Sequence, residues 1–155
     1  KAVDSEDYLD NVVGGSKGVS DTGKKLVPGE GKIGTYKDLV DDGVVGDNLT
    51  PHHAPSDKYM KKFDVSKKDG LSINMEQPQV GGRHRMTDTY GRNMTDAEKS
   101  YYYSLSPRDA LAYDIKNLRN IYKNEGLYKE MLPSLRQYAK EYIDYMPNIF
   151  GKGTK

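Results

Sequence analysis

The chain has three histidines, and these are the side chains best suited to chemistry near neutral pH. His52 and His53 are adjacent and lie between Pro51 and Pro55, while His84 follows about thirty residues later. The two prolines exclude a helix interior, so we expect an extended or turn conformation in which neighbouring side chains point in opposite directions. One imidazole of the pair could therefore hold a metal ion while the other acts on a different atom.

This division of roles suits hydrolysis of a phosphodiester bond. A divalent ion stabilises the charge that develops on the phosphate and on the leaving oxygen. A second imidazole, with an ordinary pKa of about 6.5, removes a proton from the attacking water. Such a site needs a further ligand, and His84 is the remaining imidazole of the chain that could provide it.

The histidines alone leave two other interpretations open. Two imidazoles can act as acid and base without any ion, which would make the chain a metal-independent ribonuclease. Alternatively, the histidines could hold a structural metal in a binding module that is not an enzyme. The chain has no cysteine, so thiolate zinc sites and disulfides are excluded.

Short helices are expected on both sides of the histidine pair. Thr35 is a residue type that caps helices, and it predicts a helix over residues 36–40. Ser56 predicts a second helix over residues 57–63 in the same way. The pair therefore lies on an extended segment between two capped helices.

A strand and a further helix are expected between the pair and the C-terminal third. Apolar and polar residues alternate over residues 71–75, which predicts a half-buried strand. After a loop at residues 78–82, we expect a helix over residues 83–89 that carries His84. The order is then histidine pair, strand and histidine on a helix.

The C-terminal third is predicted to be helical. Thr95 and Glu98 have the spacing of a capping box, and Ser106 followed by Pro107 predicts the start of a helix that Gly126 ends. Together with the expected strand, these helices indicate an α+β fold.

A last helix is expected to begin at Pro133 and to end before Pro147. One stripe of this helix is apolar or aromatic and consists of Leu135, Tyr138, Tyr142 and Tyr145. We interpret this stripe as core packing rather than as a base-stacking surface, because helical periodicity is first a signal of burial.

Composition divides the chain into three parts. Residues 1–31 are rich in glycine and lack an apolar period, so we expect a flexible linker from an upstream region. Residues 32–150 are expected to form the domain, and residues 151–155 a tail. Because the chain starts at Lys1 rather than at methionine, we interpret it as part of a longer protein.

The charges are unevenly distributed. Residues 1–50 contain six lysines and ten acidic residues, whereas residues 51–155 contain eighteen basic and thirteen acidic residues. The second part is therefore the one that could face a polyanion, although the excess is small. No apolar run approaches the ~20 residues of a membrane-spanning helix, so we expect no membrane partner.

Four segments resemble the successive motifs of the HNH/endonuclease VII (His-Me finger) nucleases at the C-termini of bacterial polymorphic toxins, the LXG-type proteins included. They are Gly34–Leu39, Pro51–Pro55, Ile73–Glu76 and His84–Gly91. The resemblance implies a ββα-metal core with surrounding and C-terminal helices. It also implies a secreted toxin domain that acts in the cytoplasm of a target bacterial cell.

The resemblance assigns roles to particular residues. It implies that His52 and His84 are metal ligands and that His53 is the general base. Asn74 would orient the base, and Glu76 is a weaker candidate for the site. One departure is Arg83, which stands where related toxins often have an acidic residue, so more of the metal coordination would come from water and substrate oxygens.

The two arginines beside His84 have a separate expected role. A guanidinium group matches a phosphate in a bidentate way, so Arg83 and Arg85 are candidates to hold the scissile phosphate. We also assign Arg85 to the catalytic group of residues.

The cofactor and partners follow from the same resemblance. One divalent ion is expected, which could be Mg, Mn, Zn or Ni. The substrate would be DNA in preference to RNA, and a cognate immunity protein would neutralise the toxin in the cell that makes it.

Overall fold

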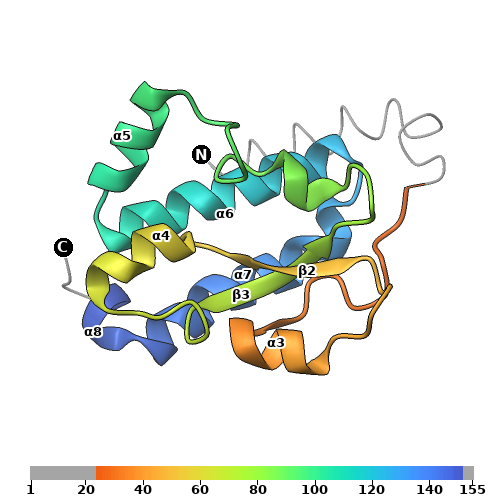
Figure 1. Ribbon diagram of the computed structural model, residues 1–155, viewed down its shortest axis with the longest axis horizontal. Coiled ribbons are helices and arrows are strands. Elements are labelled where there is room, and N and C mark those ends of the chain that lie inside the picture. The colour runs from red at the N-terminus through yellow and green to blue at the C-terminus, as the bar shows by residue number, and fades with distance from the viewer. Residues whose placement is uncertain (1–23, 152–155) are drawn as a thin grey trace.

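The computed structural model describes residues 24–151, which form an α+β fold (Figure 1). Three antiparallel strands make one sheet in the order β1-β3-β2. The strands are β1 (Ile33–Thr35), β2 (Leu49–His53) and β3 (Leu71–Glu76). In the β2–β3 register, His52 is opposite Ile73 and His53 is opposite Ser72, so the histidine pair lies on an extended strand as expected.

Helices make up most of the described chain. They are α3 (Tyr36–Asp42), α4 (Asp57–Met60), α5 (Asp96–Ser104), α6 (Pro107–Asn124), α7 (Tyr128–Tyr145) and α8 (Pro147–Phe150), with 3₁₀ helices η1 (Lys61–Phe63) and η2 (Arg83–Met86). The expected caps at Thr35, Ser56 and Ser106 and the capping box at Thr95 are confirmed. No helix within residues 24–151 is long and apolar enough to span a bilayer.

The helix expected around His84 is much shorter than predicted. η2 is a single 3₁₀ turn and ends at Met86 rather than continuing to Thr89. Gly82, with a φ of 96°, lies just before its first residue. Thr87 ends it, because Thr87 is extended and its hydroxyl donates to the His84 carbonyl at 2.8 Å. A hydroxyl that bonds to a nearby carbonyl competes with helical hydrogen bonding.

The last long helix starts earlier than predicted. α7 begins at Tyr128, so Pro133 lies inside the helix rather than at its first turn. The missing N–H of Pro133 costs the helix one hydrogen bond. Burial of Tyr128 and Met131 before the proline offsets that loss, since both side chains are at most 5% exposed.

The core lies between the sheet and α6 and α7, and α7 lies behind β3 in Figure 1. Leu135, Tyr138 and Tyr142 of α7 are buried, which confirms core packing for this part of the stripe, whereas Tyr145 is 46% exposed. β3 is buried on both faces rather than half-buried, because α3 covers the second face.

Residues 24–31 pack against the domain, which corrects the boundary predicted at Lys32. The Glu30 side chain is fully buried, and Leu26 packs against the core. Lys24 also pairs with Glu125 near the end of α6 at 2.8 Å. The rest of the predicted linker, residues 1–23, lies outside the described residues.

The described part of the predicted tail is also packed. Gly151 is buried, and its backbone N–H donates to the carbonyl of Pro147 at 2.8 Å, which ends α8. Residues 152–155 lie outside the described residues.

Candidate active site

One polar cleft of about 520 Å³ brings the three histidines together. β2 supplies His52 and His53, and η2 supplies His84. The ring centroids of His52 and His84 are 5.1 Å apart, and the rings are inclined at 69°. The convergence of these two distant segments was predicted from the sequence.

The ring of His53 is held on several sides. It stacks on Tyr36 with centroids 4.7 Å apart and an interplanar angle of 11°. Its Nε2 lies 2.8 Å from the carbonyl oxygen of Lys67. A carbonyl only accepts, so Nε2 carries the proton and Nδ1 keeps a lone pair. Gly70 leaves room for the ring, because a Cβ there would lie 2.8 Å from its Cδ2 atom.

His84 is oriented by a second hydrogen bond. Its Nδ1 meets Oε1 of Gln77, with the amide placed so that its oxygen faces the ring. The Nδ1 proton then lies in this bond, and Nε2 is the nitrogen with a free lone pair. The Tyr90 ring contacts the His84 ring nearly perpendicularly, with centroids 5.4 Å apart.

All three imidazoles favour the neutral form at pH 7. Burial lowers the pKa of His52 well below 6.5, and the neighbouring histidines lower it further. Burial also lowers the pKa of His53, although the bond to Lys67 and the charge of Asp57 oppose this. Burial, followed by the charge of Arg85, lowers the pKa of His84 to about 4. Neutral imidazoles can bind a metal ion or accept a proton.

Buried tyrosines fix the segment that follows the histidine pair. The Tyr138 hydroxyl accepts from the Ala54 backbone N–H at 3.2 Å and lies 2.7 Å from the carbonyl oxygen of Leu71. The Tyr102 hydroxyl accepts from the Ser56 N–H at 3.0 Å and donates to Asp114 at 2.6 Å. The helices therefore hold the end of β2 through hydroxyl groups as well as through apolar packing.

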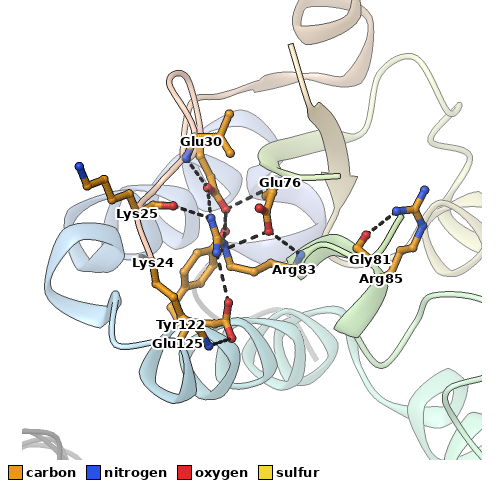
Figure 2. Close-up of polar contacts among 10 residues, drawn as sticks. Lys24, Lys25, Glu30, Glu76, Gly81, Arg83, Arg85, Tyr122 and Glu125 are labelled. Carbon is orange, nitrogen blue, oxygen red and sulfur yellow. Dashed lines mark hydrogen bonds and ion pairs between the residues drawn. The ribbon is translucent and has the colours of Figure 1, made fainter. Parts of the chain in front are cut away.

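Arg83 lies outside the cleft, contrary to its expected contact with phosphate. Its side chain is 4% exposed and makes ion pairs with Glu30 at 2.8 Å and with Glu125 at 3.2 Å (Figure 2). It also donates to the Lys25 carbonyl at 3.0 Å. A guanidinium enclosed by these partners cannot reach a phosphate in the cleft.

Arg85 points away from this ionic cluster and toward Gly81 (Figure 2). Its Nη1 also donates to the carbonyl of Pro78 at 2.7 Å. The side chain thus fastens the loop before η2 and does not line the cleft. Its link to the site is its charge, which lowers the pKa of His84.

Asn74 and Glu76 are not brought to the cleft either. Asn74 pairs with Pro51 across β2 and β3 and lines a separate cavity of about 240 Å³ beside α3. Glu76 accepts from the backbone N–H of Arg83 at 3.1 Å and belongs to the ionic cluster. Gln77, the next residue along the chain, is the one that contacts a histidine.

The cleft contains basic and aromatic side chains that the sequence analysis did not single out. They are Lys58, Lys67, Lys99, Tyr36, Tyr90 and Tyr103. Only Tyr36 and Tyr90 lie within the motifs that carry the family resemblance. The lysines come from three separate segments, so no local pattern in the sequence groups them.

His52 and His84 fit the role of a two-ligand metal site. Both are neutral, and the free Nε2 of His84 is set by its bond to Gln77. Within residues 24–151, no group of three or more histidine, cysteine, aspartate or glutamate side chains is arranged to hold a metal ion. A bound ion would therefore complete its coordination with water and substrate oxygens.

Comparisons with models of protein families, with curated proteins and with solved structures found no match. The family resemblance therefore remains a prediction from the sequence motifs.

Proposed function

We propose that this chain is a nuclease that hydrolyses phosphodiester bonds in nucleic acid, with His53 as general base and His52 and His84 as metal ligands. The observation that carries the proposal is the convergence of three neutral imidazoles in one cleft with lysines on its walls. A polyanionic substrate suits these walls. Among the described residues that line the cleft, Asp57 is the one acidic side chain, and it pairs with Lys61 at 3.1 Å.

His53 has the features that a general base requires. Its Nε2 proton lies in the bond to Lys67, so Nδ1 is the atom that accepts a proton from water. Tyr36 and Gly70 hold the ring in one orientation. Once the base is protonated, the Lys67 carbonyl and the nearby Asp57 favour the resulting imidazolium, since both raise the pKa of His53.

His52 and His84 are the residues that would hold the divalent ion. When bound, such an ion stabilises negative charge on the phosphate and on the leaving oxygen. Gln77 keeps the proton of His84 on Nδ1 and so keeps Nε2 available for the ion.

The biological setting follows from the motif resemblance. We propose a secreted toxin domain that acts on DNA in the cytoplasm of a target bacterial cell and that an immunity protein neutralises. An acidic inhibitor would complement Lys58, Lys67 and Lys99 around the cleft.

The test is incubation of the purified chain with plasmid DNA and with total RNA, with and without chelator, and with His53→Ala as the matched control. Cleavage of DNA that chelator stops and that His53→Ala lacks supports the proposal. Cleavage of RNA that survives chelator selects the metal-independent ribonuclease instead. Absence of cleavage with every ion, together with normal growth of cells that express the chain, favours the binding module.

A further inference from the structure

The two proposed metal ligands are shielded from solvent to different degrees. His52 is 4% exposed and His84 is half-buried, so a phosphate must enter the cleft to reach them.

Two lysines lie over tyrosine rings on different parts of the cleft wall. Lys67 Nζ is 5.2 Å from the ring centroid of Tyr36, and Lys58 Nζ is 5.2 Å from that of Tyr103. Tyr36 belongs to α3 and Tyr103 to α5, and in the view of Figure 1 α3 lies below the strands and α5 above them. A cation with an adjacent aromatic ring is therefore present at two separate places on the cleft wall.

Tyr90 provides an aromatic surface beside the proposed metal ligands. It is 37% exposed, and its ring is inclined at 80° to that of His84. Tyr90 lines the cleft, so a substrate that enters the cleft can contact its ring. Stacking of a base on such a ring requires a base that is not paired within a duplex.

We infer that the cleft binds an unpaired nucleic-acid strand, whose phosphates contact Lys58, Lys67 and Lys99 and one of whose bases stacks on Tyr90. This inference rests on the proposed function and narrows its substrate class. Lysine and tyrosine side chains along a groove are the combination that single-stranded nucleic acid uses for backbone attraction and base stacking. These lysines can contact the phosphates of the strand, which the buried Arg83 cannot reach.

The experiment measures binding without turnover in the His53→Ala chain. Fluorescence anisotropy is recorded with labelled single-stranded DNA and RNA of about 12 nucleotides, within the usual site size, and with the matching DNA duplex. We expect either single strand to bind at least about tenfold more tightly than the duplex. In the same background, Tyr90→Leu should weaken single-strand binding about fivefold or more.

Control variants distinguish the loss of a cleft residue from the loss of a tyrosine or lysine elsewhere on the surface. Tyr101→Leu removes a tyrosine that is 60% exposed and does not line the cleft, so it should leave binding unchanged. Lys99→Ala should reduce the slope of log affinity against log salt by about 0.7, whereas Lys129→Ala, outside the cleft, should not change it.

Duplex binding as tight as single-strand binding would overturn the inference, as would equal effects of Tyr90→Leu and Tyr101→Leu. The proposed function would survive that result if DNA is still cleaved. Failure of the chain to bind any nucleic acid would instead contradict the proposed function itself. Circular dichroism of each variant checks that the fold is intact before affinities are compared.

Discussion

The carboxylate of Glu30 and the guanidinium of Arg83 meet at 2.8 Å, although 53 residues separate them in the sequence. Glu30 also accepts from the Tyr122 hydroxyl at 2.6 Å and from the Glu76 backbone N–H at 3.2 Å. Arg83, which directly precedes His84, is therefore bound to residues 24–31, the first described segment of the chain.

We expect Glu30→Ala to lower the free energy of unfolding by about 3–5 kcal/mol, because it leaves the buried charge of Arg83 without its main partner. Lys24→Ala breaks a more exposed ion pair with Glu125 and should cost at most about 1 kcal/mol. Urea denaturation measures both variants. Equal stabilities would mean that the buried pair does not hold residues 24–31 to the domain.

The histidine variants should separate into two classes. His53→Ala should lower cleavage by about 10²-fold or more, because the base is lost, while metal binding persists. His52→Ala and His84→Ala should weaken metal binding, and added metal should restore part of their activity. Calorimetric titration with metal and a cleavage assay test this division, and loss of metal binding by His53→Ala would contradict it.

Gly70→Ala should reduce cleavage without unfolding the chain. The new Cβ would lie 2.8 Å from Cδ2 of His53, so the ring must move away from its place between Tyr36 and the Lys67 carbonyl. A displacement of about 1 Å at a catalytic group can cost about 10²-fold in rate. Gly34→Ala is the control, because its Cβ would meet Leu39 at 3.4 Å, and it should stay within about threefold of the parent in the cleavage assay.

Asp114 should contribute a decrease in the free energy of unfolding as the pH rises. Burial raises the pKa of this carboxyl from 3.8 to about 8 in the folded chain, although the bond from Tyr102 opposes the shift. The folded state thus holds a proton that the unfolded state releases, and between about pH 4 and 8 this group lowers the free energy of unfolding by up to about 1.4 kcal/mol per pH unit.

Asp114→Asn should remove this dependence, since an amide oxygen can accept from Tyr102 at every pH. Thermal denaturation of both chains at several pH values gives the comparison. If the free energy of unfolding rises more between pH 5 and pH 8 in the parent than in Asp114→Asn, the prediction is wrong.

The sequence by itself determined the local elements and the candidate histidines. The caps at Thr35, Ser56 and Ser106 act within a few residues, so their types and spacing were enough to place the helices that follow them. Pro51 and Pro55 were enough to keep the histidine pair out of a helix. The α+β class followed from these local signals.

Only the tertiary structure decided which side chains share the site with the histidines. Arg83 and Lys67 are both basic residues in short polar segments, yet Arg83 is enclosed by Glu30 while Lys67 reaches the cleft and its carbonyl orients His53. The partners that decide these positions lie many residues away along the chain. Spacing along a sequence cannot specify such contacts, because they arise when the sheet and helices pack together and bury their charged groups in pairs.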